Sequence, residues 1–141
     1  MRWIEREERV RFNEVDEWGM AWHGHYVAWF EAGRISLLER FDLLPRQMVE
    51  LGYIAPVINL TCEYKHSAVC GDSIIIRTTA IKPDIAALIC RFEIALRDNG
   101  LLLARGETKQ VLLTKDRTMI YRLSGEVEKR IAAMVDYCAG E

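Results

Sequence analysis

A single long helix, apolar around most of its circumference, limits the folds open to this chain more than any other feature. Apolar residues recur at alternating steps of three and four from residue 24 to residue 41, which is the period of an α-helix. The residues of this stripe are Tyr26, Trp29, Phe30, Gly33, Leu37 and Phe41, and Ile35 and Leu38 widen it. We expect other elements to enclose this helix, because a surface helix needs a polar face.

Strand-like segments that could enclose the helix follow it in the sequence. They are rich in Ile, Leu, Val and Thr and cover about 54–65, 73–82, 85–98 and 101–115. A further strand is expected over about 4–12, where Val10 and Phe12 share one face. This order predicts an α+β fold in which a strongly curved antiparallel sheet wraps the helix. The length is typical of one domain, which we expect over residues 1–141.

Two shorter helices are also expected. The first begins near Pro45, a residue suited to a first helical turn, and ends before Gly52. The second covers about 125–138 and has Ser124 as its N-cap. The apolar stripe of this second helix consists of Val127, Ile131, Met134 and Cys138. That stripe predicts that the C-terminal helix covers the core.

The turn at Asn99-Gly100 decides the register of the last two long strands. A two-residue loop would place three charged residues opposite an apolar row. A three-residue loop, Asp98 to Gly100 with Gly100 in the left-handed conformation of a bulge, avoids this. The expected pairs are then Cys90–Thr108, Phe92–Gly106, Ile94–Ala104 and Leu96–Leu102. Small residues in this row would leave room for the aromatic helix.

Composition and charge exclude several classes of function. The 19 basic and 21 acidic residues leave a net charge of −2, so we expect no basic face for nucleic acid. No segment approaches the roughly 20 apolar residues of a membrane span, and the N-terminus lacks a signal peptide's apolar run. The four cysteines lack metal-site and dithiol spacing and are expected to be small core residues, with a free exposed thiol as the alternative. We predict a cytoplasmic protein without a metal ion or redox cofactor.

The segment from Arg11 to Tyr26 is the densest in polar and aromatic side chains, and it ends where the long helix begins. A helix N-terminus offers unpaired backbone N–H groups, which suit a developing oxyanion. No Ser, Thr, Asp or Asn directly precedes the helix to cap those groups. Asp16, seven residues before His23, could activate water there. Alternatively, Asp16 only ties a turn through a side-chain hydrogen bond.

Three blocks of sequence, in order, resemble one known family. The first contains Asp16, Gly19, His23, Tyr26, Phe30, Gly33 and Arg34; the second runs from Glu63 to Ile74; the third runs from Ala104 to Thr108. Together they resemble the hot-dog-fold acyl-CoA thioesterases of the 4-hydroxybenzoyl-CoA thioesterase type. The resemblance implies a hot-dog fold and hydrolysis of acyl-CoA, with CoA as part of the substrate and no other cofactor.

The resemblance also implies roles for individual residues. Asp16 matches the family's catalytic carboxylate, a nucleophile or general base, and the backbone N–H of His23 is expected to bind the thioester oxygen. The remaining candidate substrate-binding residues are Trp22, Gly24, His25, Tyr26, Lys65, His66 and Lys82. Family sites lie between subunits, which implies a dimer or tetramer. The exposed edges expected for so small a sheet also favour self-pairing.

Departures from the family pattern leave alternatives open. His25 stands where the family often has Asn, so it could tune Asp16 or simply pack at the helix start. Lys82 is alone where some relatives have a basic cluster for CoA phosphates, which leaves acyl carrier protein as another carrier. A non-catalytic acyl-thioester binding module and a hydratase on the same fold are further alternatives. Arg34, on the helix, is expected to be ion-paired rather than catalytic.

Overall fold

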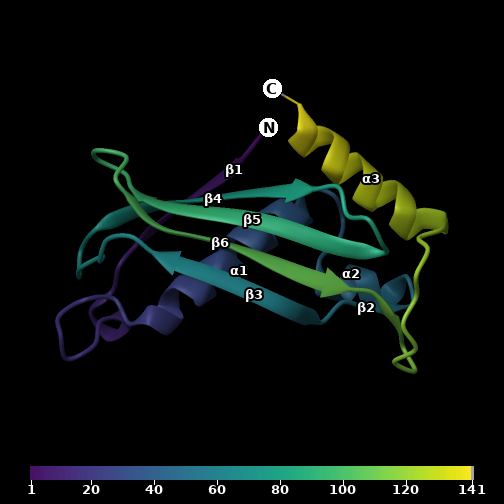
Figure 1. Ribbon diagram of the computed structural model, residues 1–141, viewed down its shortest axis with the longest axis horizontal. Helices are drawn as coiled ribbons and strands as arrows, with labels where there is room; N and C mark the ends of the chain where they lie inside the picture. The colour runs from purple at the N-terminus through teal and green to yellow at the C-terminus, as the bar shows by residue number, and fades with distance from the viewer. Residues whose placement is uncertain (141) are drawn as a thin grey trace.

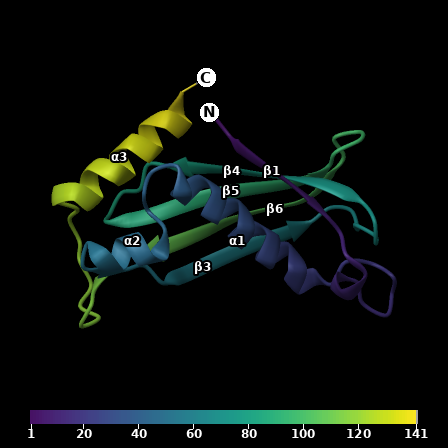
Figure 2. The same cartoon turned by 180° about the vertical axis from the view of Figure 1, so that it is seen from behind.

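A curved antiparallel sheet lies over one long helix in the computed structural model, which describes residues 1–140 (Figure 1). The helix is α1 (His23–Glu39). The sheet has the strand order β1-β4-β5-β6-β3. Its strands are β1 (Ile4–Arg9), β3 (Val57–Tyr64), β4 (Ser73–Ile81), β5 (Ala87–Leu96) and β6 (Leu102–Val111). Figure 2 shows α1 crossing the face of this sheet, so the expected α+β arrangement is confirmed.

The remaining elements are short or lie at the margins of the sheet. They are η1 (Phe12–Glu14), α2 (Pro45–Glu50), a small sheet of β2 (Tyr53–Ile54) and β7 (Leu113–Thr114), and α3 (Gly125–Ala139). The strand expected over about 54–65 is divided because Pro56 has no N–H to donate to a ladder. Helix α3 buries the predicted stripe, although the Ser124 side chain makes no capping hydrogen bond. No helix within residues 1–140 is long and apolar enough to cross a membrane.

Helix α1 packs its apolar stripe on the sheet, but it is not enclosed as expected, because its outer face, with Ala28 and Glu31, is exposed. The buried residues are Tyr26, Trp29, Phe30, Gly33, Arg34, Leu37 and Leu38. The ring of Phe30 stacks on that of Phe92 in β5, with centroids 4.7 Å apart. A Cβ atom on Gly106 of β6 would overlap the Thr61 carbonyl oxygen and lie 2.6 Å from the Phe30 ring. The prediction that small sheet residues admit the aromatic helix is therefore confirmed at Gly106.

Arg34 is the buried cation of this helix, and its charge is paired. It forms an ion pair with Glu31 and donates a hydrogen bond from Nη1 to Thr108 Oγ1 at 2.8 Å. Arg34 is 7% exposed, so a charge without these partners would be strongly unfavourable there. The expectation that Arg34 is ion-paired is confirmed.

The register between β5 and β6 agrees with the prediction over most of its length. Cys90 pairs with Thr108, Phe92 with Gly106, and Ile94 with Ala104. The pair expected for Leu96 is wrong, because Leu102 pairs with Ala95 and the register shifts after Ile94. Leu103 is the extra residue of β6, and its carbonyl accepts hydrogen bonds from the N–H groups of Lys65 and His66 at the end of β3. The register therefore shifts within β6, although Gly100 has the expected left-handed conformation, with a φ of +73°.

One prediction about an exposed residue was wrong. Strand β1 ends at Arg9, and Phe12 opens a 3-10 turn in which it is 82% exposed instead of sharing the face of Val10. The chain turns there because the Arg11 N–H donates to the Glu14 carboxylate at 2.8 Å. Among the cysteines, Cys90 and Cys138 are buried core residues, and Cys70 is exposed, which is the alternative that the sequence left open.

The two edges of the sheet differ in chemistry. Strand β1 reads IEREER, so its edge is charged. Strand β3 instead exposes large apolar side chains along its length. These residues, the β3 edge, are Val57, Ile58, Leu60 and Tyr64. An apolar, unprotected edge strand is a typical site for association with another chain.

Candidate functional site

A pocket of about 320 Å³ lies at the N-terminal end of α1, beside the end of β3. It is lined by Asp16, Trp18, Met20, Ala21, His23, Tyr26, Tyr64, Lys65, His66 and Ser67. The lining therefore joins two segments that are some 40 positions apart in sequence. Of the predicted site residues, five line this pocket: Asp16, His23, Tyr26, Lys65 and His66.

Asp16 has one carboxylate oxygen engaged and one free. Its Oδ1 accepts a hydrogen bond from the Trp18 N–H at 2.9 Å, and its carbonyl accepts one from the Gly19 N–H at 3.0 Å. The side-chain hydrogen bond by which Asp16 would tie a turn, the alternative role considered from the sequence, is thus present. The other oxygen, Oδ2, has no hydrogen-bond partner within residues 1–140. Asp16 can therefore hold the turn and still present a basic oxygen to the pocket.

The N-terminus of α1 lacks a side-chain cap. The N-cap residue is Trp22, whose side chain makes no capping hydrogen bond. The His25 N–H donates to the Trp22 carbonyl at 2.9 Å, but the N–H groups of His23 and Gly24 find no acceptor in the described chain. These two donors lie at the positive end of the helix dipole. They can hold a carbonyl oxygen on which negative charge develops.

Two tyrosines join the helix to the end of β3. The Tyr64 hydroxyl donates to the His23 carbonyl at 2.9 Å, and the Tyr26 hydroxyl oxygen accepts from the Ala68 N–H at 3.0 Å. Their rings pack edge to face with centroids 5.2 Å apart. Burial raises the pKa of Tyr64 to about 12 and also raises the pKa of Tyr26. Both phenols therefore keep their protons at neutral pH.

Tyr64 is the residue that sequence reasoning missed. Its hydrogen bond to His23 spans 41 positions, so neither periodicity nor local spacing reveals it. The available signal was the place of Tyr64 in the second block, next to Lys65. The bond fixes the first turn of α1 against β3 and so positions the two free N–H groups.

Replacing Tyr64 with Phe is expected to change the alkaline stability of the protein. The folded pKa of Tyr64, about 12, lies above the ordinary value of 10.0. The protonated phenol therefore contributes to the free energy of unfolding fully below pH 10, and this contribution is lost as pH rises through 12. Tyr64→Phe lacks this titration and should lose less stability between pH 10 and 12. Urea unfolding at several pH values measures the difference. Tyr121→Phe, at a tyrosine 73% exposed, is the control and should follow the wild type.

Lys65 and His66 lie on the pocket rim and already have partners. Lys65 Nζ lies 3.0 Å from a carboxylate oxygen of Glu63, and this hydrogen bond is the first cause of the lowered pKa of Glu63. The His66 Nδ1 lies 3.0 Å from the Leu102 carbonyl oxygen. Because a carbonyl only accepts, Nδ1 carries a proton, and Nε2 is left free for another partner. Both side chains are exposed enough to meet a charged ligand.

The other predicted binding residues lie outside the pocket lining. Trp22 packs against Gly24 and leaves no room for a Cβ there. His25 faces Glu14, with Nδ1 3.8 Å from Oε2, and its ring lies edge-on to that of Trp22. Lys82 lines a separate groove beside α3 and lies in the β4–β5 turn, which Figure 1 shows at the opposite end of the sheet from the N-terminus of α1. A single chain therefore does not bring Lys82 to Asp16.

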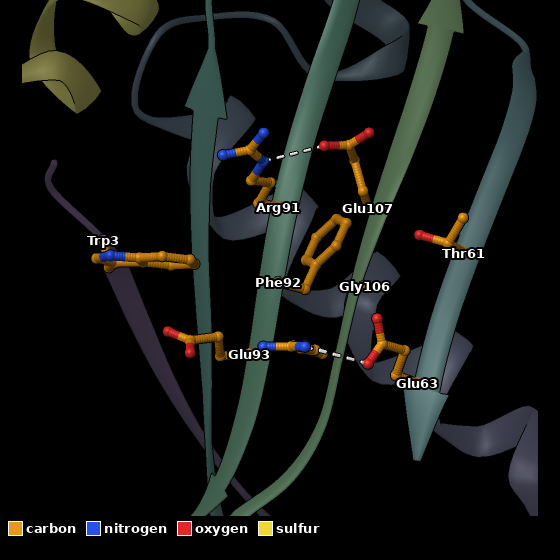
Figure 3. Close-up of a pocket in the computed structure, with 9 residues that line it drawn as sticks. Trp3, Thr61, Glu63, Arg91, Phe92, Glu93, Gly106 and Glu107 are labelled. Atoms are coloured by element: carbon orange, nitrogen blue, oxygen red, sulfur yellow. Dashed lines mark hydrogen bonds and ion pairs between the residues drawn. The ribbon is translucent and has the colours of Figure 1, made fainter. Parts of the chain in front are cut away.

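A second hollow, of about 290 Å³, lies on the face of the sheet turned away from α1 (Figure 3). Its carboxylates are matched with arginines: Arg91 Nε lies 3.0 Å from Glu107, and Arg105 Nη2 lies 3.2 Å from Glu63. Each of these two carboxylates already accepts a hydrogen bond from a guanidinium group. We therefore place the candidate site at Asp16 and not in this hollow.

Known proteins that are similar to this chain point to the same kind of chemistry. Residues 10–134 match the model of a family described as the thioesterase-like superfamily. A curated relative, the candidate acyl-CoA thioesterase YneP of Bacillus subtilis (strain 168), is 30% identical over 73 residues. That alignment covers 52% of this chain and 53% of the relative. The chain thus spans about half the length of the curated relatives it matches.

Solved structures resemble this one over nearly the whole chain. A 1,4-dihydroxy-2-naphthoyl-CoA thioesterase from Synechocystis has a TM-score of 0.82 at 20% identity, covering 92% of this chain and 96% of its own. A DHNA-CoA thioesterase from Staphylococcus aureus has a TM-score of 0.82 at 24% identity, covering 93% and 89% respectively. At these identities, the likeness shows a shared fold.

Proposed function

The chain belongs to the thioesterase-like superfamily and has its hot-dog fold, and from this premise we propose that it hydrolyses the thioester bond of an acyl-CoA. The observation that carries the proposal is the pairing of two features in one place. Asp16 keeps a free carboxylate oxygen in a pocket that adjoins an uncapped helix N-terminus. Thioester hydrolysis needs a base or nucleophile and a site for the carbonyl oxygen, and these two features supply them.

In the proposed mechanism, the N–H groups of His23 and Gly24 bind the thioester carbonyl oxygen. Asp16 Oδ2 either removes a proton from water or attacks the carbonyl carbon itself. In both routes the carbon–sulfur bond breaks, and the thiolate leaves and takes up a proton as free CoA. When water attacks the thioester, its oxygen ends in the acid. When Asp16 attacks, an acyl–Asp16 anhydride forms, and water then hydrolyses it at the Asp16 carbonyl or at the acyl carbon, which releases the acid and restores the carboxylate. Negative charge on the carbonyl oxygen is greatest in the tetrahedral intermediate, so donors fixed by the helix favour that state.

The carrier of the acyl group is proposed to be CoA, with Lys65 and His66 near its phosphates. Both residues are exposed on the pocket rim. Lys82 would need a second copy, because it lies far from Asp16 in its own chain. Thiol release should be screened with short, long and aromatic acyl-CoAs and with acyl carrier protein. Release from at least one acyl-CoA is expected, whereas tight binding without release would identify a binding module.

We also propose that the functional unit is a dimer formed through the β3 edge. An antiparallel pair of β3 strands would cover the exposed Val57, Ile58 and Leu60 side chains of both copies. It would also set the Tyr64 end of one strand beside the Val57 end of the other. Each pocket would then adjoin residues of the second copy. This arrangement supplies the walls that a chain of one domain lacks.

Replacing Leu60 with Lys is expected to give a monomer with at least tenfold lower activity. The added ammonium group would be buried without a partner between two apolar edges. Sedimentation velocity gives the mass, and thiol release gives the activity. Asn59→Lys is the matched control, since Asn59 pairs with Lys109 and lies on the opposite face of the same strand. Full activity in a monomeric wild type would contradict the dimer.

A further inference from the structure

Glu14, the last residue of η1, connects three parts of the chain around the candidate site. Its carbonyl oxygen accepts a hydrogen bond from the Trp22 N–H at 2.9 Å. Its Oε1 accepts one from the Arg11 N–H at 2.8 Å, and its Oε2 lies 3.8 Å from His25 Nδ1. Glu14 therefore ties the end of η1 to the first turn of α1, at the base of the loop that carries Asp16.

The position of Asp16 relative to α1 depends on this connection. Val15 and Ala21 form an isolated bridge that closes the Asp16 loop, so the two ends of the loop lie side by side. The residue before the loop is Glu14, and the residue after it is Trp22, the N-cap of α1. A shift of Glu14 against the helix would therefore change the distance between the Asp16 carboxylate and the N–H groups at the helix start.

The contact between His25 and Glu14 is electrostatic and partly shielded from water. A separation of 3.8 Å is too long for a hydrogen bond but suits an ion pair with a protonated imidazole ring. The two side chains are 29% and 16% exposed, so water screens their attraction less than on an open surface. The rings of Trp22 and Trp29 lie beside the imidazole, with centroids 5.7 and 6.3 Å away, and restrict its orientation.

This contact anchors the helix in place of a side-chain cap. A Ser or Asp at the N-cap would accept a hydrogen bond from the second or third N–H of the helix. The second N–H is that of Gly24, which is one of the two proposed donors to the thioester oxygen. Glu14 instead binds the N–H of Trp22 through its carbonyl and faces His25 with its carboxylate. Its negative charge near the helix start is also favourable to the helix dipole.

We propose that Glu14 and His25 are positioning residues for the proposed hydrolysis, on which this inference rests. The pair holds the first turn of α1 against the base of the Asp16 loop and leaves the N–H groups of His23 and Gly24 free for the substrate. Neither side chain lines the Asp16 pocket, so their effect should appear in kcat rather than in KM. Loss of the pair would misplace donors that matter most when the thioester oxygen becomes negative.

Removing the cation should lower turnover without weakening binding. At about pH 6, where an ordinary histidine is mostly protonated, His25→Leu should lower kcat about tenfold and leave KM within about twofold. His25→Lys keeps a cation opposite Glu14 and should recover most of this loss. Glu14→Gln still accepts from the Arg11 N–H but has no charge, and alone it should lower kcat about as much as His25→Leu. Equal kcat values for His25→Leu and His25→Lys, or an unchanged kcat in Glu14→Gln, would overturn the proposal.

A double-mutant cycle and a distant control separate this pair from the general effect of a lost charge. Because both changes break one link, Glu14→Gln combined with His25→Leu should lower kcat no further than either change alone. Multiplied effects would contradict the link. Glu8→Gln removes the charge of another partly buried carboxylate, which pairs with Arg6 at 2.8 Å in β1, and it should leave kcat unchanged.

Amide hydrogen exchange tests the anchor without any catalytic step. His25→Leu and Glu14→Gln should each speed exchange of the Val27 and Ala28 N–H groups, in the first turns of α1, about tenfold, whereas Glu8→Gln should not. Unchanged exchange, or faster exchange with wild-type kcat, would overturn the proposal. Failure of the wild type to release thiol from every acyl-CoA would instead refute the proposed function, and the exchange rates would still decide whether the pair anchors α1.

Discussion

Replacing Asp16 with Asn is expected to lower turnover by roughly 10²- to 10⁴-fold and to leave the fold intact. The Asn side-chain oxygen can still accept the hydrogen bond from the Trp18 N–H, so the turn should persist. The anionic oxygen is lost, and with it the base or nucleophile. Thiol-release kinetics measure the effect, and thermal unfolding checks the fold. Turnover within a few-fold of the wild type would refute the assignment of Asp16.

Asp72 provides a matched control for this substitution. Its Oδ2 accepts a hydrogen bond from the Val69 N–H at 2.9 Å, so it also ties a turn, but it does not line the Asp16 pocket. Asp72→Asn should therefore leave turnover nearly unchanged. A single turnover in oxygen-18 water separates the two mechanisms, because label enters Asp16 only if its carboxylate attacks the thioester.

Replacing Gly106 with Ala is expected to destabilise the protein by about 3 kcal/mol, at the upper end of overpacking effects. The added methyl group would meet the Thr61 carbonyl on one side and the Phe30 ring on the other. The first of these is backbone in a paired strand, so it cannot rotate away. Urea unfolding should show a lower midpoint. Thermal unfolding should show a Tm lower by about 10 °C for a chain of this size.

Gly100 separates the packing effect from the backbone effect of losing a glycine. Its φ is +73°, a left-handed conformation, and a Cβ there would meet no atom within 4 Å. Gly100→Ala should therefore cost about 1 kcal/mol from the backbone alone. If Gly106→Ala were no more destabilising than Gly100→Ala, the close packing of α1 on the sheet would be wrong.

The sequence predicted most of the architecture, because helix α1 and the β5–β6 rows each depend on local periodicity. The paired residues Phe92 and Gly106 followed from keeping charge off the core face. The bulge at Leu103 could not be predicted in the same way. The Leu103 carbonyl there accepts hydrogen bonds from the N–H groups of Lys65 and His66, at the end of another strand.

The site was predicted where it is contiguous in sequence and missed where it is not. Asp16 and His23 lie only seven positions apart, so the predicted start of the helix at His23 drew attention to both residues. Tyr64 is distant in sequence, and only the fold brings its hydroxyl to the His23 carbonyl. Lys82 was predicted as a phosphate-binding residue because a lysine can pair with a phosphate. Only the strand topology shows that its hairpin lies at the far end of the sheet from Asp16.

The packing of α1 on the sheet also has a consequence for synthesis on the ribosome. The helix is complete at Glu39, but the strands that cover it, β4 to β6, end only at Val111. At a synthesis rate of about 5–20 residues per second, roughly 4 to 14 s therefore pass between completion of this apolar helix and completion of the strands that cover it. The pairing of β1 with β4, such as Ile4 with Thr78, adds a slow long-range step. Until the sheet closes, the nascent chain exposes apolar surface that favours aggregation.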